Sequence, residues 1–366
     1  MQQHAITTLL ENGREAGVYP AAQASILCDS QVFHESAHGL VRPGGTDVTP
    51  STLFDIASVT KVLATTACLM TLVDQDEVAL DAPLTRYVPD APRGPTIREL
   101  LGHRSGLPAW GTFFMHSESV LTQVCSARPG VDQRRVYSDL GFILLGATIE
   151  AVTQQPLHIA ARELVLLPLG LSRTGYRPRA SSAPDPSIVV TGLTRPRRPA
   201  PGQEALYTVP EQPDALVPGE VDDDNAWAMG GVAGHAGLFS TACDVARFGA
   251  CLLEDLEGAS HLASAGTVRT FFAIDAPHLH PIRSLGFDRA TPPRSSCGTR
   301  FGAGPLGAVG HLGFTGCSLW IDLDRRISAA LLTNRVFPTR ENVAIKTFRP
   351  AFHDTLIASL VSVSED

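Results

Sequence analysis

The chain has 366 residues, of which 44% are hydrophobic, and a formal net charge of −8. This length and composition allow one large domain or two lobes around a sizeable core. The main basic cluster (Arg195, Arg197 and Arg198) is interleaved with prolines, as in a solvated loop, and no basic face is visible, so nucleic-acid binding is not expected.

The start of the chain has no targeting signal that we recognise. Residues 1–13 have neither a basic n-region nor an apolar h-region, and no apolar run is long enough to cross a bilayer. The seven cysteines are scattered and form no CxxC pair, which is typical of a reduced protein with buried thiols. We therefore expect a cytoplasmic protein with no membrane span and no disulfide framework.

The first part of the chain predicts a helix and a strand hairpin. Residues 4–16 have the spacing of a short amphipathic helix. Two β-like runs, 21–28 and 31–39, are separated by Asp29-Ser30, which is a hairpin signal.

Helical spacing predominates in the middle of the chain. It covers residues 58–73 and 139–152, and the capping box Thr96-Ile97-Arg98-Glu99 opens a short helix that ends near Gly102. Residues 177–218 contain nine prolines, so we expect a long irregular excursion there. A loop of that length in an enzyme often borders the binding cleft.

The C-terminal part again predicts strands. Thr241 caps a helix that continues through Leu253, and two alternating runs, 318–322 and 327–333, are joined by a turn. A final helix is expected over about 351–361. Strands at both ends with helices between them predict one sheet assembled from the two termini, with a helical insertion.

One lysine lies where proton transfer would need it. Only two of the 29 basic residues are Lys, and Lys61 follows Ser58 by three positions in an apolar helix. At that spacing both side chains share a face, and a desolvated Lys can lose a proton whereas Arg cannot. The helix N-terminus would favour a developing anion beside Ser58. The alternative is a buried Ser cap with a Lys that reaches to solvent.

Two further segments carry groups suited to acyl transfer. Tyr137-Ser138-Asp139 leads into an apolar helix, and a phenol near a cation can move a proton. The glycine-rich run 310–320 lets a ligand approach the backbone, where one N–H could complete an oxyanion hole with that of Ser58. The alternative explanation of the first segment is a helix start capped by Ser138 or Asp139, and that of the second is a glycine-rich turn before a strand.

In this order, the Ser-x-x-Lys, Tyr-x-Asp and His-x-Gly elements resemble those of the serine β-lactamase and penicillin-binding-protein superfamily, in particular its class C-like esterase and peptidase branch. The likeness includes residues 100–108, 224–241 and 332–335 and spans roughly residues 20–360.

The resemblance implies a fold and its division. The fold would be α/β (α+β), with an antiparallel sheet flanked by helices and a mainly helical lobe. The whole chain, 1–366, would be one serine-hydrolase domain, with a sheet lobe at about 1–57 and 236–366. The helical lobe would cover about 58–235, and the active site would lie between the lobes.

The resemblance also implies roles for single residues. Ser58 would be the acylated nucleophile, and Lys61 and Tyr137 would share the role of base. The N–H groups of Ser58 and Phe314 would form the oxyanion hole. His311 stands where many relatives have Lys, and the residue two positions on, Gly313, keeps the strand open to substrate.

Two residues depart from the family pattern. Asp139 replaces the usual Asn, and its carboxylate is expected to pair with Lys61 and raise the pKa of that lysine. Leu312 replaces a hydroxyl residue that helps to hold a substrate carboxylate in β-lactam-binding members. With Leu312 beside a mostly neutral His311, efficient penicillin hydrolysis is not expected.

The implied function is a serine hydrolase that cleaves esters or amides through an acyl-enzyme on Ser58. It would be an esterase, a D-amino-acid amidase or peptidase, or a weak β-lactamase. Its partners would be small-molecule ester, amide or peptide substrates, with no metal or organic cofactor; the oligomeric state stays open. The alternative is a non-catalytic ligand-binding or sensor protein of the same fold, which Asp139 and Leu312 favour.

Two other hydrolase classes are less well supported. For a metal-dependent enzyme, His278 and His280 have alternate spacing and His235 and His311 are available, but no His-Glu-x-x-His set occurs. The chain contains no Gly-x-Ser-x-Gly, which argues against a nucleophile-elbow hydrolase.

Overall fold

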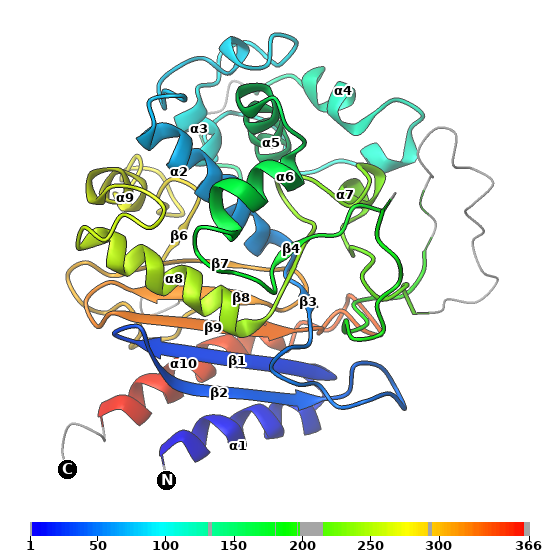
Figure 1. Ribbon diagram of the computed structural model, residues 1–366, viewed down its shortest axis with the longest axis vertical. Coiled ribbons are helices and arrows are strands. Elements are labelled where there is room, and N and C mark those ends of the chain that lie inside the picture. The colour runs from blue at the N-terminus through cyan, green and yellow to red at the C-terminus, as the bar shows by residue number, and fades with distance from the viewer. Residues whose placement is uncertain are drawn as a thin grey trace.

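A six-stranded antiparallel sheet joins the two ends of the chain (Figure 1). The computed structural model describes residues 2–130, 134–179, 181–195, 197, 215–291 and 295–361. The strand order is β2-β1-β9-β8-β7-β6. The bounds are β1 Ala21–Cys28, β2 Gln31–Gly39, β6 Asp288–Arg289, β7 Ala308–Leu312, β8 Ser318–Asp322 and β9 Ile327–Thr333. Because β1 pairs with β9 from Ala22↔Thr333 to Cys28↔Ile327, the prediction of one sheet built from both termini is confirmed.

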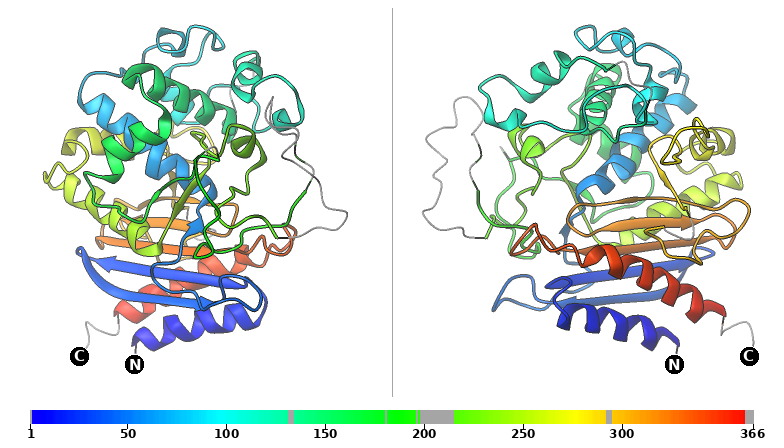
Figure 2. Two further views of the ribbon diagram at one scale, coloured as in Figure 1. Left: turned by 45° about the vertical axis from the view of Figure 1, so that its right-hand side comes forward. Right: turned by 180° about the vertical axis from the view of Figure 1, so that it is seen from behind.

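Both faces of this sheet are covered by helices. Helices α1 (Gln2–Glu15) and α10 (Ile345–Val361) lie side by side on one face, and α8 (Ala242–Leu256) packs on the other (Figure 2). Alternate side chains of β8 point to opposite faces of the sheet. Trp320 packs in the core with α1 and α10, whereas Leu319 and Ile321 pack in the core under α8. Coverage of both faces explains why every residue of β8 and β9 is buried and why most of them are apolar.

The helical part of the chain forms a second layer above α8. Its helices and helical turns are α2 Ala67–Asp74, Leu84–Arg86, α3 Ile97–Leu101, Phe113–Met115, α4 Val120–Cys125, α5 Asp139–Thr153, α6 Leu157–Ala161, Arg162–Leu166, α7 Asp224–Ala228 and α9 Ala265–Phe272. The predicted capping box is present, since the Thr96 hydroxyl accepts the Glu99 N–H and the Glu99 carboxylate accepts the Thr96 N–H.

A continuous helical segment links the sheet to the helical layer. It consists of the 3₁₀ turn Ala57–Val59, the π-helical turns Lys61–Thr66, and α2. The expectation that no apolar run is long enough to cross a bilayer is wrong for residues 57–74, the one such stretch of the described chain, but 83% of it is buried inside the protein. The segment is therefore a core helix, and it carries Ser58 and Lys61.

A small second sheet crosses the predicted boundary between lobes. Its order is β3-β5-β4, with β3 Phe54–Asp55, β4 Gly175–Tyr176 and β5 Leu238–Ser240. Strand β4 falls in the range 58–235 and pairs with β5, which falls in the sheet lobe. The division into two lobes stays a prediction.

Two sequence expectations need correction. The last helix begins at Ile345 rather than near 351 and contains Pro350. A proline there removes one helical hydrogen bond and crowds the carbonyl four residues before, and the burial of Ile345, Phe348 and Arg349 offsets that cost. Arg197 is not in a solvated loop: it is 4% exposed and pairs with Asp224 and Glu220. Of the excursion 177–218, residues 180, 196 and 198–214 lie outside the described residues.

Candidate active site

Ser58 stands at the turn between strand β3 and the core helix. The residue before it, Ala57, has a left-handed backbone with φ of +47°, and this bend turns the chain from the strand into the helix. Three residues on, the Lys61 ammonium donates a hydrogen bond to the Ser58 hydroxyl over 3.0 Å. The spacing of three thus brings the two side chains together.

Lys61 is fully buried and surrounded by acceptors. Besides Ser58, its ammonium donates to the His235 carbonyl at 3.0 Å and lies 2.7 Å from Oδ1 of Asp139. Burial by itself lowers the pKa of Lys61, but the Asp139 carboxylate and the Tyr137 phenol outweigh it, so the pKa is raised. Lys61 is therefore an ammonium ion in the resting site.

Tyr137 completes this group from the segment before α5. Its phenol has Lys61 and Ser58 as hydrogen-bond partners, and the Lys61 ammonium lies 5.0 Å from the ring centroid. Burial raises the pKa of Tyr137 and the neighbouring ammonium opposes the rise. The ring contacts two histidines, His103 at a centroid distance of 4.5 Å and His311 at 5.8 Å.

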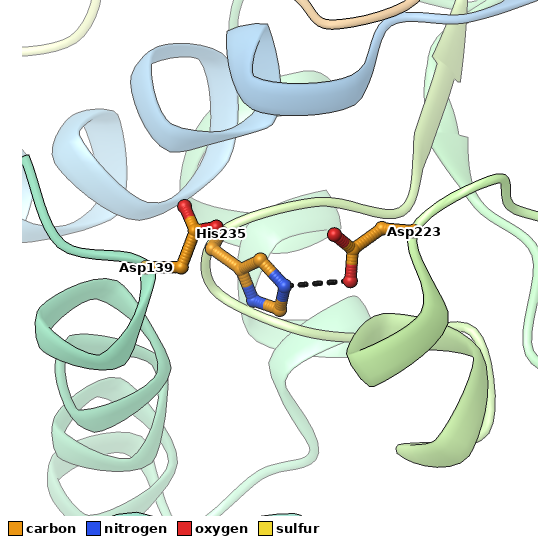
Figure 3. A group of neighbouring side chains, drawn as sticks. All are labelled: Asp139, Asp223 and His235. Atoms are coloured by element: carbon orange, nitrogen blue, oxygen red, sulfur yellow. Dashed lines mark hydrogen bonds and ion pairs between the residues drawn. The ribbon is translucent and has the colours of Figure 1, made fainter. Parts of the chain in front are cut away.

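Beside Lys61 lies a second polar group, made of Asp139, His235 and Asp223 (Figure 3). One ligand atom from each lies within 4.8 Å of the others, a spacing compatible with a metal ion. However, Asp139 already faces the Lys61 ammonium, and Nε2 of His235 shares a hydrogen bond of 2.8 Å with Asp223. Burial by itself would raise the pKa of Asp223, but the neighbouring His235 and Lys61 outweigh it, so the pKa is lowered.

Of the four histidines considered for a metal, only His235 takes part in this cluster among the described residues. His278 and His280 are exposed in a loop, and His311 lies in strand β7 against the Tyr137 ring and outside the cluster. A cation at the cluster would have to share Asp139 with the lysine, so the arrangement is better explained as the electrostatic support of Lys61.

Five of the predicted site residues line one cavity of about 460 Å³: Ser58, Tyr137, His311, Gly313 and Phe314. Lys61 and Asp139 are not in its wall; they support Ser58 from behind. Burial lowers the pKa of His311 to about 4, so its imidazole is neutral near pH 7. The His311 Nδ1 hydrogen-bonds the Leu312 carbonyl at 2.8 Å.

The end of strand β7 is pressed against the turn that carries Ser58. A Cβ on Gly313 would lie 2.5 Å from the Ile56 carbonyl oxygen, so only glycine allows this approach. The Gly313 N–H donates to the Cys317 carbonyl at 2.7 Å, whereas no hydrogen bond of the Phe314 N–H is seen within the described part of the chain. That N–H is available to a ligand next to Ser58.

The cavity wall also contains cations that sequence reasoning missed: Arg283, Arg335, Arg340, Lys346 and Arg349. They are spread over the last part of the chain among many other arginines, so only the fold reveals their convergence. Lys346 did carry a signal, because it is the only lysine besides Lys61.

Most of these cations are held in place by the protein. Arg349 donates to the Gly313 and Cys317 carbonyls, and Arg335 donates to the Phe314 carbonyl at 2.8 Å. Carbonyl partners leave the positive charge uncompensated. Arg283 is instead paired with Asp288, the one acidic residue in the described wall, and Arg340 with Asp222 outside it. Arg335, Lys346 and Arg349 have no ion pair among the described residues, so the cavity is net cationic.

A family model described as Beta-lactamase matches residues 6–350 of the chain. This chain belongs to the Beta-lactamase family. Membership agrees with the predicted fold, and the family matches identify the protein as a serine hydrolase; nothing among them supports the non-catalytic alternative.

Similar proteins include a "Putative D-alanyl-D-alanine carboxypeptidase" of Escherichia coli (strain K12), 29% identical over 352 residues, which cover 87% of this chain and 79% of that protein. Two solved structures share the fold. EstCE1, "a hydrolase with promiscuous acyltransferase activity", has a TM-score of 0.71 at 20% identity and covers 96% of this chain and 98% of its own. The D-amino acid amidase from Ochrobactrum anthropi SV3 has a TM-score of 0.71 at 20% identity and covers 99% of both chains.

Proposed function

We propose that this Beta-lactamase family hydrolase cleaves short peptides or esters that end in a free carboxylate, in the manner of a D,D-carboxypeptidase. The observation that carries the proposal is the contact between Lys61 and Ser58 at the wall of a net cationic cavity. Cations beside the nucleophile favour a substrate whose leaving group is negatively charged. The name of the Escherichia coli relative points to the same substrate class.

In the proposed reaction, Ser58 Oγ attacks the substrate carbonyl carbon and forms a tetrahedral oxyanion. The N–H groups of Ser58 and Phe314 stabilise that oxyanion. The serine proton passes to the base formed by Lys61 and Tyr137 and is then given to the leaving amine or alcohol. Water attacks the acyl-enzyme in the second half, with the same groups taking its proton, and releases the acid.

Asp139 controls when this base is available. Lys61 accepts the serine proton only after it has lost one of its own, and the carboxylate at 2.7 Å stabilises the ammonium form. The rate is therefore expected to rise with pH as the ammonium releases its proton.

Substrates that differ only in the terminal charge test the proposal. The turnover of a D-alanyl-D-alanine peptide is compared with that of its C-terminal amide, and preference for the free carboxylate is expected. In Lys346→Gln the preference should fall roughly two- to fivefold, the scale of one exposed charge. Arg269→Gln is the matched control, because it removes one charge from an exposed position outside the cavity. A faster amide substrate would contradict the proposal.

A second candidate is an amidase for D-amino acid amides, as the name of the Ochrobactrum anthropi neighbour suggests. Its support is the extent of that likeness, which covers 99% of both chains. Strong preference for a free over an acetylated D-amino acid amide would select this candidate.

We also propose a cytoplasmic location. The support is the cysteine pattern: within the described residues all seven thiols are free, and Cys68, Cys251, Cys297 and Cys317 are buried. Detection of the native protein in the membrane or secreted fraction of its source cells would contradict it.

A further inference from the structure

Asp55 is a buried carboxylate close to the nucleophile. It lies three residues before Ser58 and is 2% exposed. Each of its carboxylate oxygens accepts one backbone N–H, Oδ1 from Ala57 and Oδ2 from Asp222, both at 2.8 Å. No ion pair of Asp55 occurs among the residues that the structure describes. Burial raises its pKa to about 7, although the two amide hydrogen bonds favour the charged form.

The first of these hydrogen bonds fixes the turn that aims Ser58. Ala57 has φ of +47°, a left-handed conformation that costs a non-glycine residue about 1–2 kcal/mol. The Ala57 N–H is held by Asp55 within this turn. Because the next residue is Ser58, the same bond sets the direction of the serine N–H and hydroxyl.

The main chain of Asp55 fixes the other half of the oxyanion hole. Its carbonyl accepts a hydrogen bond of 2.8 Å from the Thr315 hydroxyl. Thr315 follows Phe314, whose N–H is the second proposed donor to the oxyanion. Asp55 therefore contacts both segments whose separation decides whether an oxyanion fits.

The second carboxylate bond extends the connection to the cavity wall. Asp222, whose N–H binds Asp55, uses its own side chain to accept hydrogen bonds from Arg340 at 2.7 Å and Arg195 at 3.1 Å. Arg340 lines the cavity that contains Ser58. One buried residue thus joins the nucleophile turn, the glycine loop after β7 and the cationic wall.

We infer that Asp55 is a positioning residue that holds the Ser58 and Phe314 N–H groups at the spacing needed for the oxyanion. The inference rests on the proposed function, since it assigns Asp55 a role in activating Ser58. Asp55 acts through its neighbours and does not line the cavity.

The test is the rate at which a fluorophosphonate labels Ser58, together with kcat and KM for a short aryl ester. In Asp55→Asn one oxygen still accepts an N–H, but the amide group faces the other N–H and repels it. Labelling rate and kcat are expected to fall about 10- to 100-fold, the scale of a small misplacement of reacting groups. KM should change less than threefold, because the substrate cavity keeps its lining.

Thr315→Val keeps the inference testable if Asp55→Asn fails to fold. It removes the hydroxyl donor to the Asp55 carbonyl and preserves shape, and slower labelling is expected. Thr148→Val is the matched control, because Thr148 is equally buried and its hydroxyl donates to the Leu144 carbonyl within α5. Labelling of Thr148→Val should equal that of the wild type.

The outcomes separate the two claims. If the folded wild type takes up no label, both the proposed function and this inference are overturned. If the wild type is labelled and Asp55→Asn and Thr315→Val are labelled equally fast, only the role of Asp55 is overturned.

Discussion

The Lys61 ammonium lies between Ser58 and Asp139, 3.0 Å from the serine hydroxyl and 2.7 Å from the carboxylate. The lysine that should accept the serine proton is thus paired with an anion that keeps it protonated. The family resemblance implies Asn at this position, so the charge is a property of this chain and shapes its pH dependence.

Replacing Asp139 by Asn should shift the pH–rate profile. The Asp139 carboxylate helps to raise the pKa of Lys61, so its removal lowers that pKa and makes the neutral amine available at lower pH. The rising limb of kcat/KM against pH is expected to move to lower pH by about one unit or more, the size of shift that one adjacent charge causes. A limb that stays in place would show that Lys61 does not set it.

Ser58→Ala should abolish turnover and leave the fold intact. The loss is expected to be at least about 10³-fold, as for other nucleophile deletions. Intact-protein mass after treatment with a fluorophosphonate checks this: one adduct on the wild type and none on the variant. An adduct of equal yield on Ser58→Ala would place the nucleophile elsewhere.

Lys61→Arg should be nearly as damaging as loss of the serine. Arginine keeps the positive charge next to Asp139 but does not release a proton at accessible pH. Ester turnover and the unfolding temperature are measured together, so that loss of the base is separated from loss of the fold. Substantial activity in a folded Lys61→Arg protein would refute a base role for Lys61.

His311 should make the protein sensitive to acid below pH 6.5. Burial lowers its folded-state pKa to about 4, against an ordinary value of 6.5. The unfolded chain therefore binds more protons, and the stability that neutral His311 contributes is complete above pH 6.5 and lost as pH falls towards 4. His311→Gln should lose less thermal stability between pH 7 and pH 4.5 than the wild type.

The activity should also rise with pH as His311 loses its proton. In a pH–rate profile of His311→Gln, this rising limb should be flatter than in the wild type.

Gly313→Ala should reduce catalysis by separating the two halves of the oxyanion hole. The new methyl group would lie 2.5 Å from the Ile56 carbonyl oxygen, so the loop must move away from the nucleophile turn. We expect kcat/KM for an aryl ester to fall about 10²-fold, as when an oxyanion donor is removed. Gly175→Ala is the control, since its Cβ meets nothing within 4 Å; equal activity of both variants would contradict the geometry.

Cephalosporin turnover should be slow despite family membership. Leu312 lacks a hydroxyl and His311 is neutral near pH 7, so strand β7 lacks the two groups that hold a β-lactam carboxylate in related enzymes, and the cations of this cavity lie on other segments. A short-chain aryl ester is expected to be the better substrate by kcat/KM. A wide preference for a cephalosporin over the ester would contradict this expectation. Inhibition of the activity by a chelator would instead indicate a metal ion at the cluster of Asp139, Asp223 and His235.

The sequence alone was enough to predict the elements and the residues that depend on short spacing. Ser58 and Lys61 meet because positions three apart share a helix face, and the hairpin of β1 and β2 follows from its turn residues and alternation. The start of α10 was placed about six residues too late, because its first turns are fixed by packing on the sheet and α1 rather than by a local signal.

Only the tertiary structure decided what surrounds that pair. The Asp55 carboxylate accepts the N–H of Asp222, which lies 167 positions away in the sequence. The cavity cations, among them Arg283 and Lys346, converge because β6, β7 and α10 meet beside Ser58. Such contacts depend on how strands and helices pack over long separations, which local periodicity does not encode. The nucleophile can thus be predicted from four consecutive residues, whereas the charge of the cavity arises only when the segment 283–349 packs beside the turn that carries Ser58.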